Sequence, residues 1–203
     1  MKKHAIGIII VVILAGFPKI HAQEMQTLFD GEITHGGFGG PIIKFDDIQN
    51  DLGVWVGGRG GWIINMNDRH AISVGGGGFG LATNHQTDVP QIEETMLATA
   101  GYGGFITEYT NRSYQLVHIT ATGLIGAGGF SLRDRDFEEI DEDPQTFFVM
   151  EPGLHAEINV TSFFRIAAGV NYRYTSGISR GDFSDSDFTG ANATLTFKFG
   201  FFR

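Results

Sequence analysis

The amino-acid sequence predicts an all-β fold: an eight-stranded antiparallel up-and-down transmembrane β-barrel that follows an N-terminal signal peptide. Three observations predict this fold class. Apolar and polar residues alternate with a period of two, which suits strands and not helices. The clearest segments run for about 11 to 14 residues, whereas soluble strands average about 5 to 6 and tilted membrane-crossing strands need about 9 to 11. Short and long connections alternate, as in barrels with short periplasmic turns and longer external loops.

Composition excludes several classes of protein. The chain has 203 residues, with 14 Lys and Arg against 23 Asp and Glu, a net charge of −9, and no cysteine. Without cysteine there is no disulfide framework, no thiolate zinc site and no lipid-anchored N-terminal cysteine. An acidic chain lacks the basic face of a nucleic-acid-binding protein, so we expect no nucleic-acid partner. The 30 glycines do not indicate disorder, because 42% of the residues are hydrophobic.

The first residues have the pattern of a secretory signal. Lys2 and Lys3 precede an apolar run at 5–17, and Ala22 offers a small residue at a cleavage point. The run is shorter than the about 20 apolar residues that a spanning helix needs. The sequence therefore predicts a signal peptide at 1–22 and one outer-membrane barrel domain at 23–203, with a retained N-terminal anchor as the alternative.

The expected strands follow one another without a break in the pattern. After the opening strand, the next four each contain the sequence Gly-x-Gly-Gly-aromatic, at 58–62, 75–79, 101–105 and 126–130. Glycine permits the bulges and close backbone approach that a narrow, strongly curved barrel needs. The last three strands alternate most clearly, and every odd residue of 195–201 is large and apolar. The expected strands are 32–43, 52–64, 70–82, 95–109, 114–129, 147–160, 163–175 and 191–202.

The connections indicate how the barrel is oriented. Short connections are expected at 65–69, 110–113 and 161–162, after the second, fourth and sixth strands. An even number of strands places both chain ends on the periplasmic side, which agrees with arrival by secretion. The longer, external connections are expected at 44–51, 83–94, 130–146 and 176–190.

Three segments of the chain resemble those of a known kind of protein. The opening segment 29–41, the tripeptide at 151–153 and the closing segment 194–200 resemble small bacterial outer-membrane β-barrels of the OmpA and OmpX kind, and a group of porin-like barrels. The resemblance implies the fold and a location in the bacterial outer membrane, and it implies no activity. In such barrels the last strand is read by the barrel assembly machinery. Carried over to this chain, that assembly signal comprises Leu195, Phe197, Phe199 and Phe201.

If the apolar faces of the strands meet lipid, the charged faces point into the barrel. An eight-stranded barrel is just wide enough for side chains to fill it, and buried charges must be paired or solvated. We therefore expect an internal charge network that plugs the barrel. The alternatives are a polar relay, a narrow porin-like channel for small solutes or ions, or a catalytic cluster around His155 and Glu157. The expected members of the network are Arg59, Glu151, His155, Glu157, Arg165, Arg173 and Lys198.

Aromatic residues near the strand ends suggest a second feature. Tyrosine and tryptophan gather where a barrel meets the two membrane interfaces. The expected aromatic girdle comprises Trp55, Trp62, Tyr109, Tyr114, Phe164, Tyr172, Tyr174 and Phe201.

Chemistry-bearing motifs are weak. His118-Ile119-Thr120 resembles the His-x-Ser pattern of lipid A-modifying barrel enzymes but lacks the serine nucleophile, so we expect no enzyme and no catalytic residue. Acidic residues crowd 134–143 and could hold Ca²⁺ or Mg²⁺ against lipopolysaccharide, although without regular ligand spacing a solvated loop is favoured. Arg180-Gly181-Asp182 spells a tripeptide known for integrin adhesion, and three residues often coincide by chance.

The leading interpretation is a monomeric outer-membrane barrel with a structural or surface-interaction role. Its expected partners are outer-membrane lipid, lipopolysaccharide and the barrel assembly machinery, and no cofactor or metal is expected. Three other classes stay open: the narrow channel, the lipid A-modifying enzyme, and a soluble secreted barrel whose apolar face turns inward. The direction in which the side chains point separates the soluble class from the others.

Overall fold

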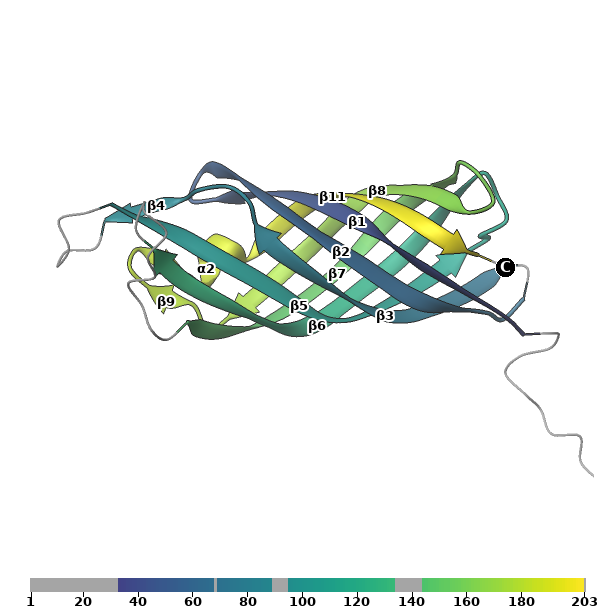
Figure 1. Cartoon of the computed structure of the whole chain (residues 1–203), viewed down its shortest axis with the longest axis horizontal. Helices are drawn as coiled ribbons and strands as arrows, with labels where there is room; N and C mark the ends of the chain where they lie inside the picture. The colour runs from purple at the N-terminus through teal and green to yellow at the C-terminus, as the bar shows by residue number, and fades with distance from the viewer. Residues whose placement is uncertain (1–32, 68, 89–94, 134–143, 203) are drawn as a thin grey trace, which may run out of the picture.

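The computed structural model describes residues 33–67, 69–88, 95–133 and 144–202. Within these residues, eight long antiparallel strands close into one barrel, whose axis runs along the long dimension of Figure 1. Sequential long strands are neighbours throughout, and the pairings of β3 with β5 and of β1 with β11 complete the ring. The long strands are β1 (Thr34–Ile48), β2 (Asp51–Asn65), β3 (His70–Leu81), β5 (Thr95–Asn111), β6 (Val117–Arg133), β7 (Gln145–Asn159), β8 (Phe164–Ser176) and β11 (Gly190–Phe201).

The two ends of the barrel differ. The described chain begins and ends at one of them, where Gly37 of β1 pairs with Phe201 of β11, and we call this the periplasmic end. Figure 1 shows β4, β9 and α2 together at the opposite end, which we call the external end. The short elements are β4 (Gln86–Asp88), which pairs with β5, the hairpin of β9 (Ser179–Arg180) and β10 (Phe183–Ser184), and the helix α2 (Asp185–Phe188).

All eight expected strands are present, but the first external connection differs from the expectation. A long loop was expected at 44–51, and this is wrong: β1 continues to Ile48 and meets β2 through a two-residue turn, Gln49-Asn50. Both turn residues have positive φ, 54° and 66°, as a type I′ hairpin turn requires. The alternation of β1 continues through Lys44 and Asp46, and both side chains are buried inside the barrel.

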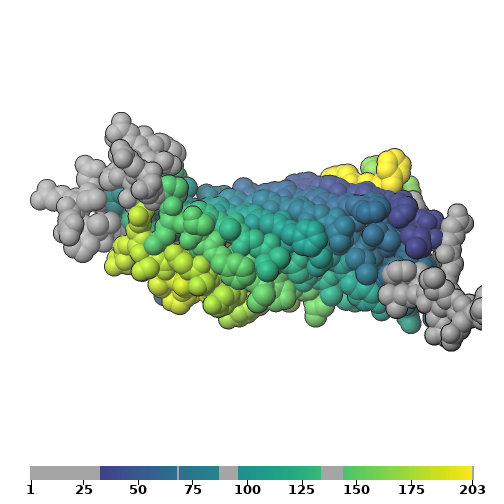
Figure 2. Space-filling model, turned by 90° about the horizontal axis from the view of Figure 1, so that it is seen from below, coloured from purple at the N-terminus to yellow at the C-terminus, as the bar shows by residue number. Residues whose placement is uncertain are grey.

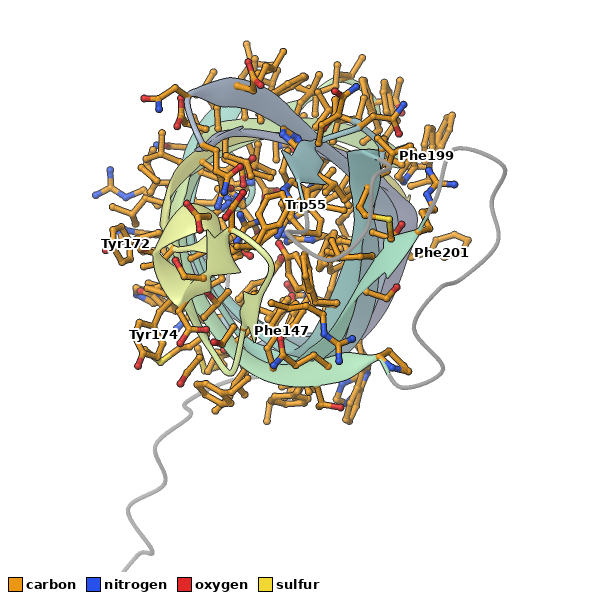
Figure 3. The ribbon with its side chains drawn as sticks, turned by 90° about the vertical axis from the view of Figure 1, so that its left-hand side faces the viewer. Trp55, Phe147, Tyr172, Tyr174, Phe199 and Phe201 are labelled. Carbon is orange, nitrogen blue, oxygen red and sulfur yellow. The ribbon has the colours of Figure 1, made fainter. Side chains whose placement is uncertain are left out.

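Burial alternates along the strands with the expected period of two. In β8 the side chains of Ala167, Asn171 and Arg173 are buried, and their neighbours Val170 and Tyr172 are exposed. Figure 3 looks along the barrel from the external end, and there Trp55 and Phe147 point inward while Tyr172, Tyr174, Phe199 and Phe201 point outward. The apolar face is therefore outside, which excludes the soluble barrel with an inward apolar face.

The glycine motifs of β2, β3, β5 and β6 lie side by side in the barrel wall. Gly60 pairs with Gly76, and Gly104 pairs with Gly126 across the neighbouring strands. A Cβ atom at Gly126 would come within 2.0 Å of the backbone oxygen of Gly103. Glycine here permits a close approach of backbones that any larger residue would prevent, as expected for a narrow barrel.

Other expectations concern segments that the structure does not describe. The signal peptide at 1–22, the domain boundary at 23 and the acidic segment 134–143 all lie outside the described residues. Among the described residues, no helix is both long and apolar enough to cross a membrane.

Candidate functional site

The outside of the barrel is apolar. Seven outward side chains of β7 and β8 have exposed fractions between 42% and 62%: Phe148, Met150, Leu154, Ile158, Val170, Tyr172 and Tyr174. Large apolar patches of this kind are rare on soluble monomers and mark a surface that is covered by something apolar. A closed barrel leaves no strand edge unpaired, so its wall can lie in lipid with every backbone group satisfied.

The inside of the barrel is polar, and its charges form two clusters. The first, the external cluster, centres on Glu151, which is 3% exposed. Lys44 Nζ lies 2.7 Å from Glu151 Oε1, and the Tyr102 hydroxyl donates a hydrogen bond of 2.8 Å to Glu151 Oε2. Lys44 Nζ also lies 3.7 Å from the centre of the Phe79 ring. Three strands, β1, β5 and β7, are therefore joined across the interior.

Arg173 connects the external cluster to the mouth of the barrel. Its guanidinium pairs with Asp46 and lies 4.5 Å from the Trp55 ring, and Arg173 Nε donates a hydrogen bond of 2.7 Å to the backbone oxygen of Phe188. Trp55 Nε1 in turn donates to Asp46 Oδ2 at 3.0 Å. The arginine therefore fixes α2 to the barrel wall.

Neutral polar side chains occupy the middle of the barrel. His155 Nε2 lies 2.8 Å from Asn171 Oδ1, and Asn171 Nδ2 donates to Asn192 Oδ1 at 2.9 Å and to Thr194 Oγ1 at 2.5 Å. Gly153 provides the space for this chain, since a Cβ atom there would lie 1.8 Å from Asn171 Oδ1. These hydrogen bonds satisfy polar groups that burial would otherwise penalise.

The second cluster, the periplasmic cluster, is built around Lys198 of β11. Lys198 Nζ lies 2.8 Å from Glu108 Oε2 and also pairs with Glu157, while Arg59 pairs with Glu108. Two further residues face Glu157: His118 Nε2 at 3.5 Å from its carboxylate and Arg165 Nη1 at 4.0 Å. Strands from opposite walls are joined by this cluster as well.

The interior charges nearly balance. Among the described residues they comprise five cations, Lys44, Arg59, Arg165, Arg173 and Lys198, and four anions, Asp46, Glu108, Glu151 and Glu157. Every one of these carboxylates lies within 4.0 Å of a cationic nitrogen. Pairing is necessary because an unpaired charge in such an interior costs several kcal/mol.

Little empty space is left between these side chains. Two interior cavities measure about 20 and 10 Å³; the first is lined by Lys44, Arg59 and Glu151, and the second by Glu108, Glu157 and Lys198, among others. A cavity of about 10 to 15 Å³ is needed to hold one water molecule. A larger hollow of about 520 Å³ lies at the periplasmic rim, beside Tyr114 and Phe163.

All seven residues expected in the lumen are buried inside the barrel: Arg59, Glu151, His155, Glu157, Arg165, Arg173 and Lys198. Sequence reasoning missed three charged members, Lys44, Asp46 and Glu108, and the hydroxyl of Tyr102. The period of two could have revealed them. Lys44 and Asp46 continue the alternation of β1 past its expected end, and Glu108 shares the buried face of β5 with Tyr102 and Ile106.

One member of the expected aromatic girdle is wrong. Trp55 is only 1% exposed and packs against Tyr102 inside the barrel, with ring centres 5.1 Å apart. Residues 55 and 59 are an even number of positions apart in β2, so the alternation of the strand points both side chains inward. Phe164 faces outward but is partly covered by Phe199, whose ring centre lies 4.7 Å away. The remaining six lie exposed on the outside: Trp62, Tyr109, Tyr114, Tyr172, Tyr174 and Phe201.

The expected assembly signal forms the outward face of the last strand. Phe199 and Phe201 are 46% and 81% exposed, and Leu195 and Phe197 are half-buried. The next residue, Phe202, turns inward and is 5% exposed, where it lies 3.8 Å from the Arg165 guanidinium. The strand therefore presents a row of apolar side chains to lipid up to the periplasmic end.

The external mouth is filled by the segment that joins β8 to β11. Ile178, Phe183 and Phe188 of this segment are 1 to 2% exposed and belong to the main apolar core. The rings of Phe183 and Phe188 lie 5.4 and 5.5 Å from that of Phe130 on the barrel wall. We call residues 177–189 the external plug.

Within the described ranges, no group of three or more His, Asp or Glu side chains is placed to hold a metal ion. His118 and His155 are 3% and 2% exposed and face the filled interior.

A closed eight-stranded barrel with an apolar outside and a polar, filled inside has the architecture of a small outer-membrane β-barrel. No protein-family model and no curated protein matches the sequence. Solved structures do match the fold. Ail, the attachment invasion locus protein of Yersinia pestis, is 15% identical with a TM-score of 0.45, over 82% of this chain and 97% of that chain. Neisserial surface protein A is 12% identical with a TM-score of 0.44, over 84% and 97%. Ail in complex with the heparin analogue sucrose octasulfate is 14% identical with a TM-score of 0.46, over 82% and 97%.

Proposed function

We propose that the protein is a monomeric barrel of the outer membrane that acts through its external end and conducts nothing through its interior. The observation that carries this proposal is the filled lumen. Charged pairs occupy its two halves, and two cavities lined by these pairs measure about 20 and 10 Å³. A barrel of this size has no room for both a packed network and a water-filled path.

The filled lumen also argues against the two alternative functions, a channel and an enzyme. A channel would need the ion pairs of Lys44 and Lys198 to separate, and each separation would leave a buried charge without its partner. A lipid A-modifying enzyme would need its catalytic histidine at the lipid surface, whereas His118 and His155 face inward. Both features favour a role in which the barrel is a rigid anchor.

The external end is where such an anchor can meet other molecules. The external plug closes the mouth. Arg173 holds it through a hydrogen bond to the Phe188 oxygen, and within the plug the Ile178 amide donates a hydrogen bond to Asp185. Binding surfaces on loops depend on this kind of rigid support. Lipid and lipopolysaccharide around the wall, and the assembly machinery that reads β11, are the partners proposed for the barrel itself.

Planar bilayers test the proposal. The purified full-length protein, refolded into vesicles and fused with a bilayer, should stay electrically silent over a range of voltages. Heat-dependent mobility on gels should show that the same sample contains folded barrel. Discrete conductance steps from folded protein that change in an Arg173→Ala variant would contradict a filled lumen and support the narrow channel.

A further inference from the structure

Two neighbouring turns at the periplasmic end carry arginines. Arg69 lies in the turn between β2 and β3, Arg112 lies in the turn between β5 and β6, and both residues are exposed. The turns touch, because the Arg112 amide donates a hydrogen bond to the backbone oxygen of Arg69. Among the described residues, neither guanidinium has a hydrogen-bond or ion-pair partner within the chain. Both cations are therefore available to a molecule outside the chain.

Exposed carboxylates lie at the opposite end of the barrel. The described residues of the periplasmic turns, 66–67, 69, 112–116 and 160–163, include no Asp or Glu, and Asp68 lies outside the described residues. At the external end, Asp47, Asp51 and Asp182 are all exposed. The described periplasmic rim is therefore basic, and the anionic groups that a membrane places beside such a rim are lipid phosphates.

The two arginines lie just beyond the aromatic girdle. Tyr109 is exposed on the outside of β5, three residues before Arg112, and its hydroxyl lies 2.6 Å from Nδ1 of His70. Aromatic side chains with a polar edge mark the boundary between acyl chains and headgroups. Three strand residues span about 10 Å, and less along the membrane normal in a tilted strand. The long side chain of an arginine reaches the headgroups from this level.

The hollow at the periplasmic rim begins next to Arg112. Its walls include the exposed rings of Tyr114, Phe163 and Phe201. Figure 2 shows the yellow end of the chain, which contains Phe201, at the surface of this end of the barrel. The volume of about 520 Å³ falls within the range of about 300 to 1,000 Å³ that is usual for small-molecule sites. The hollow therefore has room for part of a lipid molecule.

Polar groups in the floor of the hollow already have partners within the chain. Arg165 lines the hollow, but its guanidinium lies 4.0 Å from Glu157 and 3.8 Å from the centre of the Phe202 ring. Asn159 Nδ2 donates hydrogen bonds to two backbone oxygens of the β5–β6 turn. The hollow therefore offers aromatic surface, and the available positive charge lies beside it on the two turns.

This combination of charge and apolar surface matches an anionic lipid. A guanidinium binds phosphate through two parallel hydrogen bonds, and aromatic rings bury apolar chains well. We propose that Arg69 and Arg112 hold the phosphate of an anionic phospholipid of the periplasmic leaflet, one acyl chain of which packs against the rings of the hollow. A zwitterionic lipid also has a phosphate, but its ammonium group is repelled by the two cations. The inference rests on the proposed function, because it requires this end of the barrel to lie at the periplasmic face of the outer membrane.

Native mass spectrometry of the full chain in detergent micelles tests the proposal. The probes are dioleoylphosphatidylglycerol, which is anionic, and dioleoylphosphatidylcholine, which has the same acyl chains and a zwitterionic headgroup. One molecule of the anionic lipid should bind more tightly than the zwitterionic lipid. Its dissociation constant should rise about fivefold in Arg112→Gln and about 25-fold in Arg69→Gln/Arg112→Gln, because each arginine near anionic lipid contributes about a factor of five.

Two further variants separate the charge from the hollow. Arg180→Gln is the matched control, since it removes an arginine from the external end, and it should leave both dissociation constants unchanged. Phe163→Ala removes apolar surface and no charge, so it should weaken the binding of both lipids by the same factor and keep the preference between them.

Three results would overturn the inference: equal affinity of the folded barrel for the two lipids, a preference that persists in Arg69→Gln/Arg112→Gln, or a preference that Arg180→Gln lowers as much as Arg112→Gln does. Unchanged affinities in Phe163→Ala would overturn the place given to the acyl chain. Failure of the chain to form a barrel would instead overturn the proposed function, and heat-dependent gel mobility of the same sample tells these failures apart.

Discussion

At the residue scale, Glu157 is the carboxylate of the periplasmic cluster that faces three basic side chains. It is fully buried, pairs with Lys198, and faces His118 and Arg165 at 3.5 and 4.0 Å. Removing its charge leaves Lys198 with Glu108 as its one remaining carboxylate partner among the described residues, and Glu108 is shared with Arg59.

Glu157→Gln should therefore destabilise the barrel strongly. Breaking one partner of a buried ion pair costs about 3 to 5 kcal/mol of unfolding free energy. Urea unfolding of the refolded protein in lipid vesicles measures this change. The double variant Glu157→Gln/Lys198→Met should lose less than the sum of the two single variants, because it removes the uncompensated charge together with its partner. Additive losses would show that the two side chains do not interact.

At the scale of the strands, β2 shows how much the sequence could predict. Its existence, length and apolar outside were all expected from the alternation, and so was the inward direction of Arg59. Trp55 was nevertheless assigned to the girdle, because its place near a strand end outweighed its parity with Arg59. The structure shows that parity decides: Trp55 packs inside, while Trp62 is 52% exposed outside.

The two tryptophans of the chain allow a direct test of this difference. In vesicles of brominated lipid, Trp55→Phe leaves only Trp62, whose fluorescence should be quenched strongly because its ring contacts the acyl chains. Trp62→Phe leaves only Trp55, which should keep most of its emission because the barrel wall separates it from lipid. Equal quenching of both variants would contradict the inward position of Trp55.

The alternation of side chains also bears on the end of β1, which lies further along the chain than expected. A long connection was expected at 44–51, and no Asn-Gly or Asp-Gly pair marks the two-residue turn that the structure has at 49–50. The partners that make the buried charges of Lys44 and Asp46 acceptable, Glu151 and Arg173, lie more than 100 residues away in sequence. Local patterns do not show which distant residues pair, whereas the inward direction of Lys44 and Asp46 follows from the period of two, which continues past residue 43.

At the scale of the whole molecule, the closed barrel could be predicted because its signals repeat eight times along the chain. The external plug could not be predicted, since Ile178, Phe183 and Phe188 are scattered among polar residues and are buried only by the mouth of the finished barrel. The packing of the interior and of the external end therefore depends on contacts between segments that are distant in sequence, and no single segment predicts it.

The central claim is that the apolar faces of the strands meet lipid and the charged faces fill the barrel. The chain has no cysteine, so single-cysteine variants along 166–172 of β8 each carry one spin label. In lipid vesicles, collision with oxygen should be frequent for labels at Ile166, Ala168, Val170 and Tyr172 and rare at the alternate positions Ala167 and Asn171. Gly169 is left unlabelled, because a Cβ atom there would lie 2.2 Å from the backbone oxygen of Leu154. Water-soluble nickel reagent should reach neither set. Frequent nickel collisions at the alternate positions, or accessibility without a period of two, would contradict the account.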